Sequence, residues 1–105
     1  MERIAELLNK LGIPFAYDHF AEGESPDPPF VCYRVPNTEN FGADGVVYFG
    51  INVVDIELYT DFKSPETEQK LEDLLTEYGI FYEKNEAFIE SEKLYEVLYE
   101  FEEEA

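Results

Sequence analysis

The segment VVYFGINVVDIELYTD, residues 46–61, limits the fold more than any other part of the chain. In its second half Ile56 and Leu58 alternate with the acidic Asp55 and Glu57. A period of two is typical of a β-strand with one buried and one polar face. The segment therefore predicts a sheet whose apolar face must be covered by other elements.

Four further segments carry strand signals, and glycine, proline or polar clusters separate them. Gly50 and Asn52 interrupt the long segment itself and predict a bulge, a bend or a tight hairpin there. The stretch PNTEN, residues 36–40, is rich in turn formers and is expected to be a linker. The four other strands are expected at residues 15–20, 30–35, 80–84 and 93–102.

Two segments repeat apolar residues at helical spacing. Residues 2–11 form the first, which Gly12 should end in the left-handed conformation. Residues 65–78 form the second, with Ser64 as the N-cap, Pro65 at the first helical position and Gly79 after the end. The buried stripes are expected to be Ile4, Leu7, Leu8 and Leu11 in the first helix and Leu71, Leu74, Leu75 and Tyr78 in the second.

The predicted order is α-β-β-β(β)-α-β-β within one domain, residues 1–105. Only one strand-helix-strand step could require a parallel crossover, so the other connections are expected to be hairpins. We therefore predict an α+β fold, with a mainly antiparallel mixed sheet and two helices packed on one face.

The chain has 25 acidic against seven basic residues, a formal net charge of −18. Nucleic-acid binding needs Lys and Arg to displace counterions from phosphates, so direct nucleic-acid binding is not expected. An anionic membrane surface is excluded on the same ground. The start at Met1 shows no basic and apolar leader pattern, and the single Cys32 fits a reducing compartment, so we expect synthesis in a cytoplasm.

No arrangement of residues predicts a catalytic, cofactor or metal site. His19 is the only histidine, and on a strand its neighbour Asp18 would point to the opposite face. Cys32 lies within a predicted strand, where a buried, inert thiol is the usual outcome. Asp55 and Glu57 share a strand face, but calcium and magnesium need several converging oxygens and no EF-hand spacing occurs. A small hydrolase or metal-dependent enzyme remains an open alternative.

Two groups of residues are candidates for contact with other molecules. The stretch NFGADGVVYFG, residues 40–50, has turn-forming glycines beside apolar residues, but neither a dinucleotide fingerprint nor a phosphate-loop lysine. We interpret it as a loop and strand that reach a neighbouring subunit, with Phe41, Asp44, Val46, Val47, Tyr48 and Phe49 as contacts.

The second group is acidic and is expected to face solvent or a central channel. On the last strand Tyr95, Val97, Tyr99 and Phe101 should enter the core, which turns the intervening glutamates outward. The members of this acidic face are Asp55, Glu57, Glu96, Glu100 and Glu102.

Taken together, LGIPFAYDHFAEGESPDPPFVCY, NFGADGVVY, IELYTDFKSPETEQKLEDLL and YGIFYEKNEAFIESEKLYEVLYEFE cover nearly the whole chain. In this combination the chain resembles the short tail-completion proteins of siphophages and Gram-positive prophages, also described as tail-terminator or head–tail joining proteins. The most specific pieces are the FGADG loop, the ELYTD strand end and the closing segment AFIESEKLYEVLYE. None of them is a catalytic motif.

The resemblance implies a structural virion protein rather than an enzyme. Members of this group are α+β domains that form a ring, usually a hexamer, on the tail-tube end that faces the head. The ring stops tube polymerisation and offers a docking surface to a head-side connector protein. The implied partners are therefore other copies of the chain, the tail-tube protein and the connector, and the implied location is the neck of the virion.

Two alternatives to this role stay open. Neighbouring neck proteins, such as head-closure connectors, are of similar size. The high negative charge is also typical of an acidic protein-binding module, for example a DNA-mimicking inhibitor of a DNA-binding enzyme.

Overall fold

The computed structural model describes residues 2–21, 23–43 and 46–104, which form two helices and five strands. The molecule is elongated, with extents of 50 × 30 × 22 Å. The elements follow one another in the order α1 (Glu2–Leu11), β1 (Phe15–Tyr17), β2 (Phe30–Ala43), β3 (Val46–Thr60), α2 (Pro65–Glu77), β4 (Glu83–Ile89) and β5 (Leu94–Glu104).

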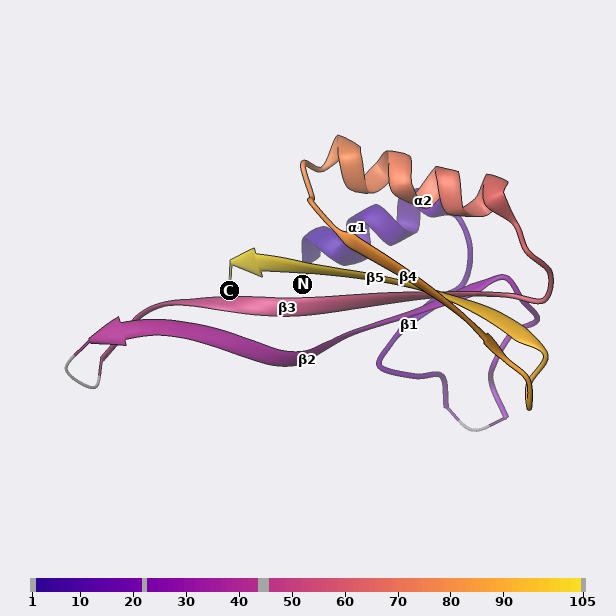
Figure 1. The fold of residues 1–105 in the computed structure, drawn as a ribbon, viewed down its shortest axis with the longest axis horizontal. Helices are drawn as coiled ribbons and strands as arrows, with labels where there is room; N and C mark the ends of the chain where they lie inside the picture. Colours follow the sequence, from indigo (N-terminus) through magenta and orange to yellow (C-terminus); the bar gives the residue numbers. More distant parts are fainter. Residues whose placement is uncertain (1, 22, 44–45, 105) are drawn as a thin grey trace.

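The five strands form one sheet in the order β1-β2-β3-β5-β4 (Figure 1). Only β1 and β2 are parallel, and the other neighbouring pairs are antiparallel. The predicted α+β class with a mainly antiparallel mixed sheet is therefore confirmed. The expectation that only a strand-helix-strand step needs a crossover was wrong. β1 and β2 are parallel, and the described residues between them, 18–21 and 23–29, contain no helix.

Both helices lie on the same face of the sheet, as predicted (Figure 1). The apolar stripes of α1 and α2 meet the inward side chains of the three central strands. Tyr95 is only half-buried, but the other three members of its predicted stripe are in the core. The buried cluster consists of Ile4, Leu7, Leu8, Val31, Tyr33, Val54, Ile56, Leu58, Leu71, Leu75, Val97, Tyr99 and Phe101.

The helix ends follow the predicted signals with one exception. Gly12 and Gly79 adopt positive φ angles of 82° and 70°, which glycine accommodates without strain. After α2 the Ile80 N–H donates to the Leu75 carbonyl at 2.9 Å, which satisfies a carbonyl at the helix end. The Ser64 side chain does not cap the helix; its hydroxyl pairs with Thr67 Oγ1 at 2.8 Å instead.

The hairpin of β2 and β3 departs from the prediction. β2 continues through residues 36–40, which were expected to be a linker, and β3 passes Gly50 and Asn52 without a break. The pairing shifts register between Arg34 and Asn37 and again between Phe41 and Gly42. Pro36 lies in the first of these irregularities, where its missing N–H does not interrupt the ladder.

The other strand boundaries also differ from the predicted ones. β1 is shorter than predicted and ends at Tyr17. β4 begins at Glu83 rather than residue 80, and it continues past residue 84, where the predicted strand ended, to Ile89. β5 extends the predicted last strand to Glu104.

Candidate functional site: a projecting arm and an acidic sheet face

The distal parts of β2 and β3 form a two-stranded arm that projects from the body of the domain (Figure 1). β1 pairs only with residues 31–33 of β2, and β5 ends where Glu104 pairs with Ile51. Among the described residues, the strand segment 37–43 therefore pairs only with β3, and the segment 46–50 pairs only with β2. We call these two segments the arm. A two-stranded hairpin without a third strand or a helix is only marginally stable alone.

Five of the six predicted subunit contacts fall on the arm. Asp44 lies outside the described residues. The two strands of the arm contain Phe41, Val46, Val47, Tyr48 and Phe49. Their role in contacts between copies stays a prediction.

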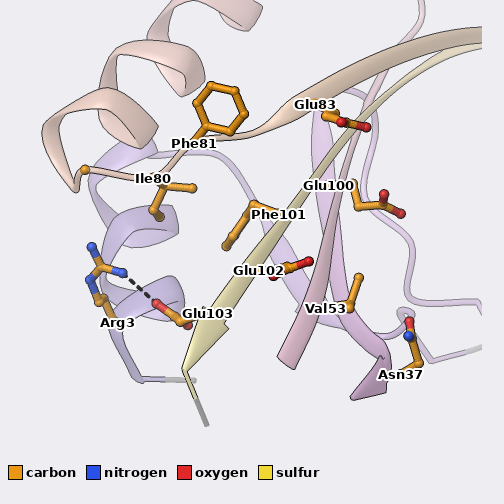
Figure 2. A pocket seen from close by; sticks show the side chains of 11 residues that line it. Arg3, Asn37, Val53, Ile80, Phe81, Glu83, Glu100, Phe101, Glu102 and Glu103 are labelled. Carbon is orange, nitrogen blue, oxygen red and sulfur yellow. Dashed lines mark hydrogen bonds and ion pairs between the residues drawn. The ribbon is translucent and has the colours of Figure 1, made fainter. Parts of the chain in front are cut away.

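The sheet face opposite the helices carries the five predicted acidic residues. Their cross-strand register places Asp55 opposite Glu100, and Val53 opposite Glu102. Glu100 and Glu102 are exposed, as expected of a solvated face. Figure 2 shows these two glutamates and Glu83 from the neighbouring strand at one end of this face. Neighbouring residues of β3, β5 and β4 thus contribute carboxylates to one acidic face.

The solvated position predicted for Asp55 was wrong. This residue is only 6% exposed, whereas Glu57 and Glu96 are half-buried. Its strand is the central one of the five, so side chains of both neighbouring strands flank it. The Asp55 Oδ1 atom has no hydrogen-bond partner among the described residues, and Oδ2 lies 3.9 Å from Arg34 Nε.

Arg34 is the base that faces these carboxylates from β2. Its Nε atom lies 3.3 Å from Glu57 Oε1, closer than to Asp55. The Tyr59 hydroxyl donates to Glu57 Oε2 at 2.5 Å. Burial, followed by this hydrogen bond, raises the pKa of the Tyr59 hydroxyl. Glu57 is therefore well satisfied, and Asp55 is the poorly compensated member of the acidic face.

Burial, and then the negative charge of Glu100, raises the pKa of the Asp55 carboxyl, although Arg34 acts in the opposite direction. Because the pKa is higher in the folded chain than in the unfolded one, the ionised carboxylate destabilises the fold at neutral pH. This penalty is lost as the pH falls through the pKa of the folded state.

Asp55→Asn is accordingly expected to raise the melting temperature at pH 7 by a few degrees, because the amide keeps the shape and removes the charge. The advantage should shrink as the pH is lowered, since the wild-type carboxyl then becomes neutral too. Thermal unfolding followed by circular dichroism from pH 4 to pH 8 measures both effects. Glu102→Gln, at an exposed position of the same face, should leave the melting temperature nearly unchanged. A lower melting temperature of Asp55→Asn at pH 7 would contradict this account of the charge.

A cavity of about 1170 Å³ lies beside the end of β5 (Figure 2). β4 begins opposite Glu100, so the last residues of β5 have no strand partner on this side among the described residues. Arg3 donates hydrogen bonds to Glu103 Oε1 at 2.6 Å and to the Tyr78 carbonyl. Arg3 is the one basic residue among the described lining residues, and both of these bonds are made within the chain. The lining residues are Arg3, Asn37, Val53, Gly79, Ile80, Phe81, Glu83, Glu100, Phe101, Glu102 and Glu103. None of these lining residues is a histidine, serine or cysteine.

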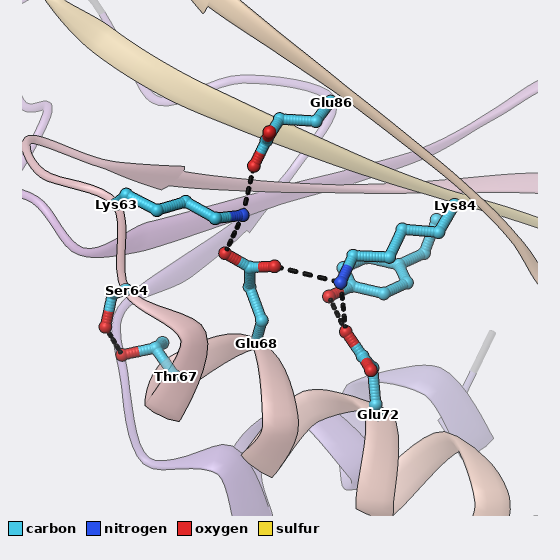
Figure 3. Close-up of polar contacts among 8 residues, drawn as sticks. Lys63, Ser64, Thr67, Glu68, Glu72, Lys84 and Glu86 are labelled. Atoms are coloured by element: carbon cyan, nitrogen blue, oxygen red, sulfur yellow. Dashed lines mark hydrogen bonds and ion pairs between the residues drawn. The ribbon is translucent and has the colours of Figure 1, made fainter.

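A partly buried ion-pair network between α2 and β4 was not predicted (Figure 3). Glu68 is 4% exposed and accepts hydrogen bonds from Lys63 at 2.6 Å and Lys84 at 2.9 Å. Glu72 accepts from Lys84 at 2.7 Å and from the Tyr99 hydroxyl at 2.8 Å. The spacing of Glu68 and Glu72, four residues apart on one helix face, was a usable signal, but their lysine partners come from outside the helix.

The charges of this network fit a structural role. Burial opposes ionisation of Glu68, but the hydrogen bonds from Lys63 and Lys84 outweigh it and lower the pKa of the carboxyl. Burial lowers the pKa of Lys84, but the hydrogen bonds with Glu72 and Glu68 outweigh it and raise the pKa to about 12. A lysine that is so firmly protonated cannot act as a nucleophile at neutral pH. The network therefore fastens α2 to β4.

His19 and Cys32 offer no catalytic pair. β1 ends before Asp18, which has a positive φ angle of 66°, so the prediction that Asp18 points away from His19 was wrong. The Asp18 Oδ2 atom lies 2.7 Å from His19 Nδ1, and both side chains are exposed. Cys32 is buried as predicted, and burial followed by the charge of Glu57 raises the pKa of its thiol. A thiol of raised pKa is a poor nucleophile.

The chain matches no family model and no curated protein. No three His, Cys, Asp or Glu side chains within the described ranges come together in a way that could hold a metal ion. None of the described helices has the length and apolar character needed to cross a membrane.

Proposed function

We propose that this chain is a structural, non-enzymatic subunit of a phage head–tail junction. In this role several copies assemble into a ring that caps the tail tube, stops its polymerisation and allows the head to join. The observation that carries the proposal is the β2–β3 arm, whose outer edges pair with no other strand in the part of the chain that the structure describes. The resemblance of the sequence to tail-completion proteins supports a place at the head–tail junction, where a head-closure connector is the alternative role.

The distribution of charge supports assembly through the arm. Residues 35–54 contain two acids, Glu39 and Asp44, and no base. The remaining 85 residues carry the other 23 acids and all seven bases. Copies of a chain with net charge −18 repel one another, so contacts between them should use its least charged surface. The arm lies within this weakly charged part of the chain.

The bases of the body contribute little to attraction between copies, because most of them contact groups of the same chain. Arg3 pairs with Glu103, and Arg34 lies against Glu57. Lys63 and Lys84 are held in the network around Glu68. The acidic sheet face is consequently left with a surplus of negative charge. Such a face could line a channel that passes DNA without holding it, since like charges repel.

An acidic protein-binding module, such as a DNA-mimicking inhibitor, is the second candidate. The acidic sheet face favours it, because three strands present carboxylates on one surface. A long, nearly uncharged arm has no role in the mimicry of a phosphate backbone. Capture of one basic protein per chain, without self-association, would favour this second function.

Deletion of the gene from a phage genome that carries it tests the proposal. Electron microscopy is expected to show overlong tails that are not joined to heads, because nothing then ends tube growth. The wild-type gene supplied in trans should restore normal particles. Particles with normal tails and necks that lack this protein would overturn the proposal. A turnover of any small molecule that depends on the folded chain would overturn its non-enzymatic part.

A further inference from the structure

The hydrogen-bonding direction of the arm can be worked out from the base of the hairpin. The Val31 N–H donates to the Pro14 carbonyl at 2.9 Å, and the Tyr33 carbonyl accepts from Asp18 N–H at 2.6 Å. These two β2 residues therefore point their backbone groups toward β1, away from β3. Arg34, the next residue, must point toward β3, where Asp55 is its partner.

Alternation along β3 then fixes the outer groups of both arm strands. In a strand the backbone groups of every second residue point to the same side. Because Asp55 faces β2, the backbones of Ile51 and Phe49 also face β2, where their partners are Glu39 and Phe41. The backbone groups of Thr38 and Asn40 consequently point outward from β2. On β3 the backbone of Gly50 points to the side of β5, beyond the last paired residues Ile51 and Glu104.

The arm thus has two different open edges, one on each strand. The β2 edge runs from Thr38 to Ala43, and the β3 edge runs from Val46 to Gly50, where β5 no longer pairs. No strand of the described part of the chain pairs with either edge. Unpaired N–H and C=O groups along a nearly uncharged strand are a ready template for another strand.

We infer that the β3 edge of one copy pairs with the β2 edge of a second copy of this chain, so that the arms form a continuous antiparallel sheet around the ring axis. This inference rests on the proposed function and identifies the segments that join the copies. Neighbouring arms related by rotation about the axis point the same way, so β3 of one copy runs antiparallel to β2 of the next. The sheet closes on itself and leaves no open arm edge.

Pairing between unlike edges is favoured over pairing between like edges. A β2–β2 contact is self-complementary and closes with two copies, whereas a β3–β2 contact repeats from copy to copy and can close a ring. The edges of the body are poor competitors for an incoming strand. β1 is three residues long, and β4 carries Glu83, Lys84 and Glu86 along its length. Short and charged edge strands resist pairing.

Proline substitutions on the outer edge test the inference. Thr38→Pro and Asn40→Pro each remove an outward N–H while the pairs of Glu39 and Phe41 with β3 stay available. Thr38→Ala and Asn40→Ala are the matched controls, because they change the same side chains and keep the N–H. Native mass spectrometry over a range of protein concentrations measures assembly, and circular dichroism checks that every variant is folded.

The proline variants are expected to need about tenfold higher concentration or more for half-assembly, since each interface loses a hydrogen bond and leaves an unpaired carbonyl. The alanine variants should assemble like the wild type. Assembly of the proline variants at the wild-type concentration would overturn the edge pairing and leave the proposed ring intact. An equal loss in the alanine and proline variants would also overturn it, because side chains rather than backbone would then join the copies. A wild-type chain that never assembles would contradict the proposed function itself.

Discussion

A variant with a shortened arm is expected to be a folded monomer. Replacing residues 40–50 by Asn-Gly joins Glu39 to Ile51 through a two-residue turn, and these two residues are already paired. The β3–β5 pairs from Ile51 onward are kept. The body should keep its wild-type melting temperature, because the arm supplies no member of the described core cluster.

Size-exclusion chromatography with light scattering measures this loss of assembly. The protein concentration needed for half-assembly is expected to rise at least about a hundredfold, because the contact surface itself is gone. The gene for the shortened chain should fail to restore normal tails in the deleted phage, whereas the wild-type gene restores them. Full assembly of the shortened chain would show that the copies meet through the body and not the arm. A large drop in its melting temperature would show that the arm supports the body.

Leu71→Ala is expected to lower the free energy of unfolding by about 2–5 kcal/mol. The Leu71 side chain is fully buried in the cluster between α2 and the sheet, so its removal leaves a cavity. Urea denaturation followed by circular dichroism measures the change.

Leu74→Ala on the same helix is the matched control, since Leu74 is only partly buried against the same cluster. Its loss of stability should be clearly smaller than that of Leu71→Ala. Equal losses at the two positions would contradict the placement of the helix on the sheet.

The helices could be predicted closely because their signals are local. The apolar stripe of residues 2–11 and the start at Pro65 are each the property of a single segment. Both helices lie within a residue or two of the predicted bounds. Ser64 failed as a side-chain cap because its hydroxyl has a second partner nearby, Thr67. Composition favours a cap at such a position but does not decide between two available partners.

The arm could not be recognised from the alternation of side chains. Burial imposes a period of two only where one strand face meets a core, and the stretch PNTEN lies beyond the core. Its turn-forming residues therefore indicated a linker, whereas the chain continues as β2 opposite β3. β4 was misplaced for a similar reason, because most of its residues are exposed and give no burial pattern.

The candidate site was predicted in part. Sequence placed the acidic residues on one sheet face correctly, since the core positions of β3 and β5 determine which residues point outward. It could not show that Asp55 is buried, because burial depends on the order of strands in the sheet. Neither could it pair Glu68 with Lys84, which comes from another element.

The mass of the assembled wild-type chain tests the central claim most directly. One 12.2 kDa chain that acts by building a ring should give a single closed species, a fixed whole-number multiple of the chain mass, across a range of concentrations. Native mass spectrometry provides this measurement. A monomer at every concentration, or an open ladder of sizes without a preferred closed form, would contradict the claim.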